Sequence, residues 1–287
     1  MNLYTIDTGF FKLDGGAMFG VVPKSLWEQF HPADENNLCT WAMRCLLVET
    51  EGRLILIDNG IGDKQDDKFF SHYFLHGEDT LGKSLRKHGF TADDITDVFL
   101  THLHFDHCGG SIRREGGKLV PAFRNARYWS NEHHWKWATE PNPRERASFL
   151  PENILPIQES GQLHFVPVTR EQEDATPYVK DVFPGFDVLC VNGHTDAMMI
   201  PHIAYKGRTL IYMADLLPSK HHVRTPWVMA YDTRPLLTMR EKGPVLEKAA
   251  REGSILFFEH DSDTECAVLE QVGKGVRVKE TMRLDEW

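Results

Sequence analysis

The sequence predicts an α/β protein with a single domain over residues 1–287. Short β-branched and aromatic runs, typical of buried strands, alternate along the chain with segments of helical periodicity. Several of these strands end in side chains that can bind metals, and such ends are where open α/β sheets place their sites. The second half repeats the element order of the first, so we expect two halves, roughly 1–160 and 161–287.

The first forty residues contain an apolar, glycine-punctuated stretch at 10–20 and a short helical candidate at 24–30. One interpretation is an edge hairpin that turns at Gly15 and Gly16. The other is a loop whose Met18 and Phe19 wall a substrate pocket. The two interpretations have equal weight.

A hairpin of buried strands is predicted at 45–50 and 53–58, and the second strand ends in Asp58. An acid at such a strand end can ligate a metal, but the pattern favours a turn cap that hydrogen-bonds the ligands. An amphipathic helix at 80–89 and a capped turn at 91–95 then lead to a short buried strand at 97–100.

The next loop concentrates His102, His104, Asp106 and His107 within six residues. Such polar side chains lose contact with water when they are crowded together, and imidazoles repel one another once they are protonated. Holding them together is therefore costly unless a cation lies between them. The loop therefore predicts a metal site. We expect Cys108, which follows it, to fill buried space rather than to act as a redox switch.

A strand at 124–129 precedes a helix that we expect Ser130 to cap. Adjacent helical residues point about 100° apart, so we expect His133 and His134 on the surface or at a pocket rim rather than on one metal. Trp135 belongs either to the core or to an apolar substrate entrance. Prolines predict a loop-rich excursion at 141–161.

The second half supplies three more candidate ligands, each where a predicted strand ends. His194 follows a strand at 186–191, and Asp215 and His260 end the strands at 209–215 and 254–260. Further strands are expected at 163–168 and 202–205, with a helix at 237–252. Each residue alone is an ordinary capping or buried residue; together they favour one shared site.

Composition excludes several classes of function. The formal charge of −10 argues against a general binder of nucleic acid or of anionic membranes, which needs a basic surface. No apolar run is long enough to span a membrane, and no signal peptide is evident. Five scattered cysteines without a CxxC spacing suit reduced thiols, so we expect a cytoplasmic protein that acts on a small molecule.

The order HxHxDH, a distant Gly-His, a strand-end Asp and a final His resembles that of the metallo-β-lactamase-fold hydrolases. The resemblance implies a four-layer αββα sandwich of two mixed sheets flanked by helices. It implies that one metal is held by His102, His104 and His194, the other by Asp106, His107 and His260, and that Asp215 bridges both.

That ligand set implies two divalent ions, with zinc favoured over iron, manganese, cobalt or nickel. A hydroxide between the ions would attack the carbonyl of a small ester or lactone, with Asp106 as proton relay and Asp215 as the bridging carboxylate. The alternatives are a phosphotriesterase and, with iron, a redox enzyme such as a sulfur dioxygenase. A nuclease and a non-catalytic binder are disfavoured.

The segments at 13–20 and 214–218 are similar to those of the branch that contains N-acyl-homoserine lactonases and methyl parathion hydrolase. This similarity predicts a substrate pocket lined by Met18, Phe19, Trp135 and Pro218. Pro218 is itself a departure, since the best-known lactonases carry a tyrosine there. Aromatic side chains expected to be exposed at 135–137 make a homodimer a hypothesis.

Overall fold

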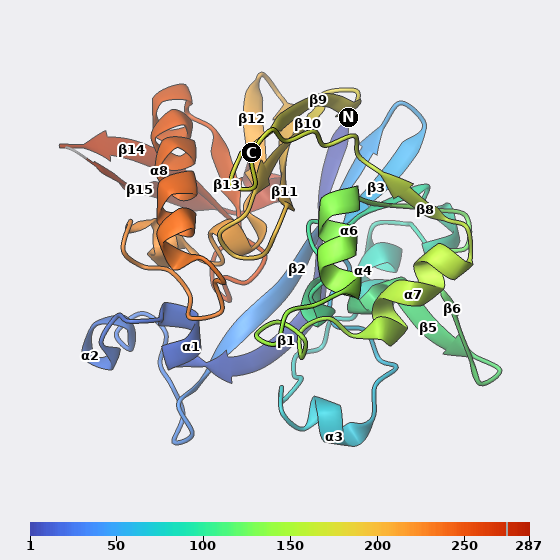
Figure 1. The fold of residues 1–287 in the computed structure, drawn as a ribbon. Coiled ribbons are helices and arrows are strands. Elements are labelled where there is room, and N and C mark those ends of the chain that lie inside the picture. Colours follow the sequence, from blue (N-terminus) through green and yellow to red (C-terminus); the bar gives the residue numbers. More distant parts are fainter. Residues whose placement is uncertain (274) are drawn as a thin grey trace. The chain divides into compact units, whose positions relative to one another are not determined.

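Two mixed β-sheets organise the computed structural model, which describes residues 1–273 and 275–287 (Figure 1). The chain divides into a first unit of Met1–Gly9 with Met43–Val168 and a second unit of Phe10–Ala42 with Thr169–Trp287. Strands β1 (Asn2–Asp14) and β2 (Leu38–Thr50) continue from one unit into the other. The segment at 10–42 thus belongs to the second unit. The sequence predicted two continuous halves that meet near residue 160.

The first unit contains the sheet with strand order β1-β2-β3-β4-β7-β8. Its remaining strands are β3 (Arg53–Ile57), β4 (Asp97–Phe99), β7 (Arg127–Ser130) and β8 (Leu163–Phe165). The predicted hairpin is confirmed by the antiparallel pairing of β2 with β3, whereas β3, β4, β7 and β8 are parallel. The carboxyl ends of these parallel strands therefore share one edge of the sheet.

The helices of the first unit lie in the connections between its strands. They are α3 (Asp67–Phe70), α4 (Leu81–Lys87), α5 (Phe105–Cys108), α6 (Glu132–Thr139) and α7 (Pro151–Glu159), beside a small hairpin of β5 (Ile112–Glu115) and β6 (Lys118–Pro121). The capping box expected at Thr91 is present, but Asn131 rather than Ser130 caps α6.

Helix α7 corrects the prediction of a loop-rich excursion at 141–161. Pro151 stands in the first turn of α7, where its missing N–H costs nothing and its fixed φ favours the helix. Pro156 lies inside the same helix. Ile154 and Ile157 bury one face of α7 in the core of the first unit, and this packing outweighs the proline penalty.

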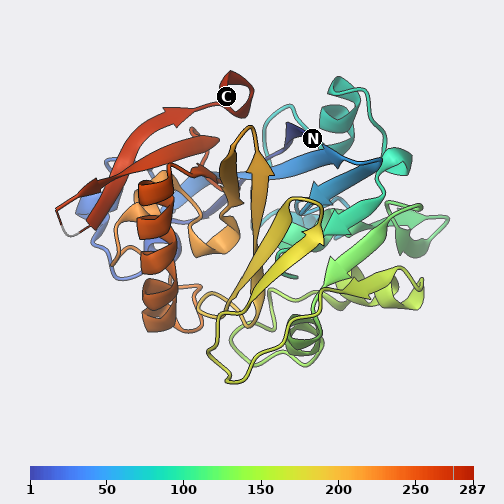
Figure 2. The same cartoon turned by 90° about the horizontal axis from the view of Figure 1, so that it is seen from above.

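The second unit contains the sheet with strand order β15-β14-β13-β12-β11-β10-β9. The strands are β9 (Tyr178–Phe183), β10 (Phe186–Val191), β11 (Met198–Tyr205), β12 (Arg208–Tyr212), β13 (Ile255–Phe257), β14 (Cys266–Val272) and β15 (Gly275–Met282). Only β12 and β13 pair in parallel among these described strands, through the crossover helix α8 (Pro235–Glu252). Helix α8 packs against β14 and β15 (Figure 2). It ends at Gly253, which adopts the left-handed conformation.

The hairpin expected at Gly15 and Gly16 is wrong. Strand β1 runs to Asp14, whose carboxylate accepts the N–H of Ala17 and so starts helix α1 (Gly15–Phe19). A Cβ on Gly15 would lie 2.4 Å from the ring of Trp27 in helix α2 (Lys24–Trp27). Glycine is required here for close packing and not for a turn.

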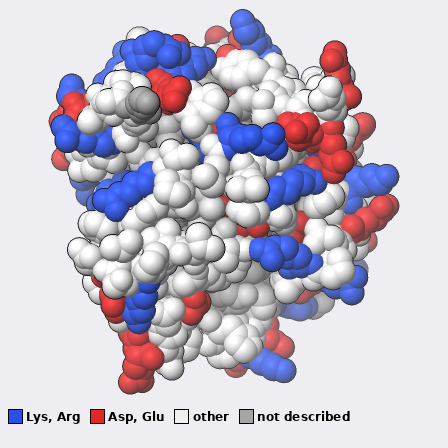
Figure 3. All heavy atoms as spheres, turned by 60° about the vertical axis from the view of Figure 1, so that its left-hand side comes forward, with Lys and Arg blue, Asp and Glu red and all other residues white. Residues whose placement is uncertain are grey.

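The predicted fold class is confirmed, since both sheets are mixed and are flanked by helices. In the described part of the chain, no helix is long and apolar enough to cross a membrane. On the face drawn in Figure 3, Lys and Arg are interspersed with acidic and uncharged residues rather than joined in a basic strip. That face lacks the continuous positive surface that binding to a nucleic-acid backbone uses.

Candidate metal centre

The loop after β4 brings two predicted ligands of the first unit together. His102 and His104 are buried, and His102 Nε2 lies 3.1 Å from His104 Nδ1. His104 is the N-cap of the short helix α5, which carries Asp106 and His107 in its single turn. The motif therefore occupies a strand-end loop, as its sequence predicted, and its ring nitrogens converge.

Asp58, directly after β3, binds this loop through hydrogen bonds. Its Oδ1 accepts the backbone N–H of Thr101 (2.8 Å), and its Oδ2 accepts the Thr101 hydroxyl (2.7 Å). The same Oδ2 lies 3.1 Å from Nδ1 of His107, leaving Nε2 of that ring for a metal. These contacts fit the predicted role of Asp58 as a partner of a ligand.

The glycines after the motif allow two loops to touch. A Cβ on Gly109 would lie 2.0 Å from the carbonyl oxygen of Ile61, and one on Gly110 would lie 2.3 Å from that of Asn59. The buried ammonium of Lys64 donates to the Gly109 carbonyl. The loop that follows Asp58 is thus pinned directly to the end of the histidine motif.

Two further residues support the first-unit histidines and were missed from the sequence. His134 is buried, and its Nε2 accepts the N–H of Leu103 at 2.9 Å, which corrects the expected surface or rim position. Glu145 is also buried, and its Oε1 lies 3.4 Å from His104 Nε2. Both lie more than 30 residues from their partners, so no local spacing could have revealed them.

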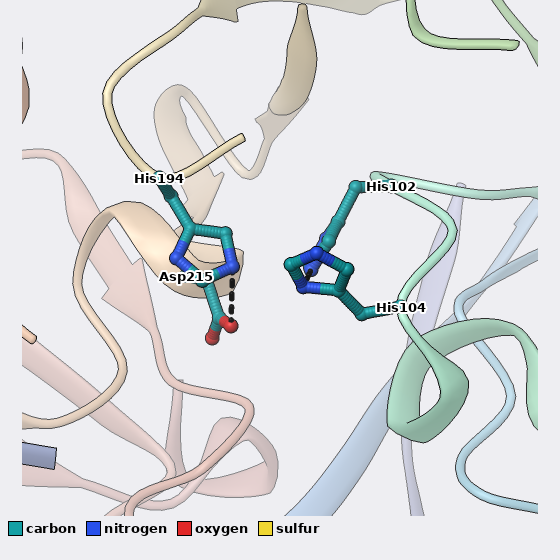
Figure 4. A group of neighbouring side chains, drawn as sticks. All are labelled: His102, His104, His194 and Asp215. Atoms are coloured by element: carbon teal, nitrogen blue, oxygen red, sulfur yellow. Dashed lines mark hydrogen bonds and ion pairs between the residues drawn. The ribbon is translucent and has the colours of Figure 1, made fainter. Parts of the chain in front are cut away.

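The second unit presents His194, Asp215 and His260. Asp215 Oδ2 lies 3.1 Å from Nε2 of His194, and Asp215 Oδ1 lies 3.1 Å from Nε2 of His260. Figure 4 draws the His194–Asp215 pair, and from the first unit His102 and His104. One carboxylate therefore offers a separate oxygen to each of two imidazoles.

The outer nitrogens of these rings are also held. Nδ1 of His194 lies 3.0 Å from Oδ1 of Asp232, and Nδ1 of His260 lies 2.8 Å from the Ala42 carbonyl oxygen. Burial lowers the pKa of His194, but the Asp215 and Asp232 carboxylates outweigh it and raise that pKa to about 10. A metal ion that binds this ring would displace the proton that the two carboxylates favour, because a histidine binds metals in its neutral form.

Asp215 is presented by strained backbone. Ala214, just before it, has φ of 42°, a left-handed conformation that costs a residue with a Cβ roughly 1 kcal/mol or more. The 3₁₀ turn at Ala214–Leu216 is separated from the end of β12 by Met213 alone. Strain at this position is consistent with a functional constraint on the direction of the carboxylate.

The donor set in both units fits a divalent metal of the zinc type. The donors are imidazole nitrogens and carboxylate oxygens, and the outer nitrogens of His107 and His194 face carboxylates, as is usual for metal-bound histidines. Cys108 is buried, and burial raises the pKa of its thiol to about 12, so the prediction of a space-filling cysteine is confirmed.

The predicted pocket residues lie in different surroundings. Met18, Phe19 and Pro218 are buried in the second unit, where Phe19 stacks on His222 with ring centroids 4.9 Å apart. Trp135 is only 7% exposed and packs in the core of the first unit, because helix α6 turns it inward. The expectation of an exposed aromatic cluster at 135–137 is therefore wrong for Trp135, and the homodimer hypothesis loses that support.

The sequence and the fold were compared with those of known proteins. A model described as the metallo-beta-lactamase superfamily matches residues 44–263. The N-acyl homoserine lactonase of Bacillus thuringiensis is 25% identical over 276 residues, which cover 92% of this chain and 94% of the relative. A probable metal-dependent hydrolase from Staphylococcus aureus superposes with a TM-score of 0.85 at 27% identity over 98% of both chains. AidC, a dizinc quorum-quenching lactonase solved with its product, has a similar fold, with a TM-score of 0.76 at 21% identity over 98% of this chain and 95% of AidC.

Proposed function

Since the chain belongs to the metallo-beta-lactamase superfamily and is a metal-dependent hydrolase, we propose that it opens lactone rings at a centre of two divalent metal ions. We propose that zinc is the native metal. The lactone substrate is supported by the lactonase of Bacillus thuringiensis, which aligns over most of both chains. A pair of zinc ions is supported by the fold shared with the dizinc lactonase AidC.

Two groups of side chains would hold the ions. His102, His104, His194 and Asp215 could hold one ion, and Asp106, His107 and His260 could hold the other. With Asp215 shared, each ion would have three ligands of its own and one common carboxylate. That would leave coordination positions for water and substrate, as in catalytic rather than structural sites.

The observation that carries this proposal is the position of Asp215. Its two oxygens face two different imidazoles, His194 and His260, at 3.1 Å each. A carboxylate that only paired with one histidine would direct one oxygen, or both, to that ring. The arrangement instead matches a bridge between two ions.

The bound ions would supply Lewis acidity, which polarises the substrate carbonyl and acidifies water for attack. Asp106 is almost completely buried beside His107 and would move the proton toward the departing alkoxide. Contact of Met18, Phe19 and Pro218 with the apolar part of the substrate stays a prediction. Trp135 is not included, because it packs in the core of the first unit.

The proposal is tested by metal analysis and a substrate panel on protein purified without chelator. The panel contains N-acyl homoserine lactones, p-nitrophenyl esters, a phosphotriester, a β-lactam and a glutathione persulfide with oxygen uptake as its readout. We expect two zinc equivalents per chain and the highest kcat/KM for a lactone. A preference for the phosphotriester or the persulfide would assign one of the alternative reactions.

Asp215→Asn is the decisive variant, with Asp285→Asn as its matched control, because Asp285 is exposed near the C-terminus. We expect Asp215→Asn to lose at least one metal equivalent and 100-fold or more in kcat, and the control to behave as wild type. Unchanged metal content and turnover in Asp215→Asn would refute the two-metal centre.

We also propose a cytoplasmic location. All five cysteines are free and buried. Free thiols are typical of the cytoplasm, because disulfides form mainly in oxidising compartments. The measurement is fractionation of cells that express the intact chain from its own gene. Recovery of the protein in a secreted or periplasmic fraction would contradict the location without affecting the metal centre.

A further inference from the structure

Helix α8 carries a buried acid whose partners are on the loop before His194. Glu241 lies in the middle of α8, far from either helix end, and is 6% exposed. Its Oε1 accepts the backbone N–H of Asn192 at 2.7 Å, and its Oε2 accepts that of Gly193 at 2.9 Å. Both oxygens of one carboxylate are thus used to hold the two residues that precede a predicted metal ligand.

The same loop touches α8 one turn earlier. A Cβ on Gly193 would lie 2.3 Å from the backbone nitrogen of Thr238, so glycine alone fits between loop and helix. Thr238 and Glu241 are three residues apart and therefore share a face of α8. Steric contact and the carboxylate together fix the position of the loop along the helix.

The other sides of His194 are held by a different segment. Thr233 N–H donates to the His194 carbonyl at 3.0 Å, Arg234 N–H donates to the Gly193 carbonyl at 2.8 Å, and Asp232 faces the ring. The ring and the carbonyl side are therefore fixed by residues 232–234. The N–H side depends on Glu241.

We propose that Glu241 is a positioning residue for His194, and that it controls the occupancy of the one metal ion that His194 would bind. The inference rests on the proposed two-metal centre. A carboxylate is needed because each of its two oxygens accepts a different N–H group. Glutamine replaces one of those oxygens with an NH₂ group, which donates and cannot accept. Burial raises the pKa of Glu241 to about 7, although the Asn192 and Gly193 N–H groups oppose that rise.

The experiment compares Glu241→Gln with Glu247→Gln, an exposed position on the same helix. Zinc binding is titrated against a chromophoric chelator, and cobalt-loaded protein is followed by visible absorption. In Glu241→Gln we expect one ion to bind about tenfold more weakly and the other to bind as in wild type. Tenfold is the low end of the loss seen when a direct partner of a metal ligand is removed, because Glu241 acts on His194 through its backbone. Glu247→Gln should match wild type at both sites.

Asp232→Asn provides an independent comparison, because it disturbs the same histidine from the ring side. We expect both variants to weaken the same ion, with matching changes in the cobalt spectrum. If Glu241→Gln does not yield folded protein, Glu241→Asp, which keeps the charge on a shorter arm, is titrated in its place. Equal weakening of both ions, or of neither, would overturn the role assigned to Glu241. Failure of the wild type to bind two ions would instead refute the proposed function.

Discussion

Nε2 of His134 accepts a 2.9 Å hydrogen bond from the backbone N–H of Leu103, the residue between His102 and His104. A side chain from helix α6 thus fixes the backbone between the two predicted ligands. His134→Phe keeps a ring in the same space but leaves a buried N–H without this acceptor. We expect a loss of about 1 to 3 kcal/mol in unfolding free energy, measured with urea, together with weaker zinc retention. The neighbouring, partly exposed His133 supplies the control variant His133→Phe, and equal losses in both variants would contradict the role of His134.

Metal removal should lower stability as well as activity. The proposed binding groups are assembled only in the folded chain, so a bound metal ion would stabilise the folded state by mass action, by about 2.7 kcal/mol at a free concentration a hundredfold above Kd. We expect chelator-treated protein to lose turnover and to show a lower Tm, and added zinc to restore both. A Tm independent of chelator would argue against bound metal in the folded protein.

Lys242 clamps a loop of the second unit. Its ammonium is buried, at 1% exposure, and donates to the carbonyls of His222 (2.9 Å), Arg224 (3.1 Å) and Trp227 (2.6 Å). Lys242→Met keeps the length of the side chain but removes all three bonds. We expect a loss of about 2 kcal/mol in unfolding free energy. The exposed Lys248 lies on the same helix, and Lys248→Met should change stability by no more than about 0.5 kcal/mol.

His202 should make stability depend on pH. Burial lowers the pKa of this 7%-exposed histidine to about 4, whereas the unfolded chain titrates near 6.5. Between these values the unfolded state binds more protons, so the contribution is fully present above about pH 6.5 and is lost as pH falls toward 4. The shift corresponds to about 3 kcal/mol.

The measurement for His202 is urea unfolding from pH 4.5 to 7.5, in the wild type and in His202→Gln. Other buried histidines contribute to the wild-type slope, so the difference between the two proteins is the quantity of interest. We expect a shallower slope in His202→Gln. Substitution of the exposed His72 by glutamine should leave the slope unchanged, and identical slopes in all three proteins would contradict the prediction.

The fold class and the hairpin of β2 and β3 were predictable because both depend on local patterns. The Glu51-Gly52 turn between two β-branched runs specifies an antiparallel pair, and the structure forms it. Gly15 and Gly16 also resembled a turn, but the capping carboxylate of Asp14 and the packing of Trp27 select a helix instead. Local composition could not reveal that tertiary contact.

The candidate site divides in the same way. His102 and Asp106 stand within a few residues of each other, so their spacing alone predicted a metal. Asp232 binds His194 from 38 residues away, and Glu241 binds the preceding Gly193 from 48 residues away, through contacts that only the folded chain creates. Acids in a helix or loop usually face solvent, and the sequence held no signal that these two do not.

The division of β1 and β2 between the units has a consequence for synthesis of the chain. Residues 10–42 are synthesised early, whereas their partners in the second unit are synthesised much later. The Met18 carbonyl, for example, binds His222, which lies 204 residues further along the chain. At ribosomal speeds this segment waits roughly 10 to 40 s for that partner. Phe19, Trp27 and Trp41, all buried in the end, are exposed meanwhile, so the N-terminal segment is where the nascent chain most needs protection from aggregation.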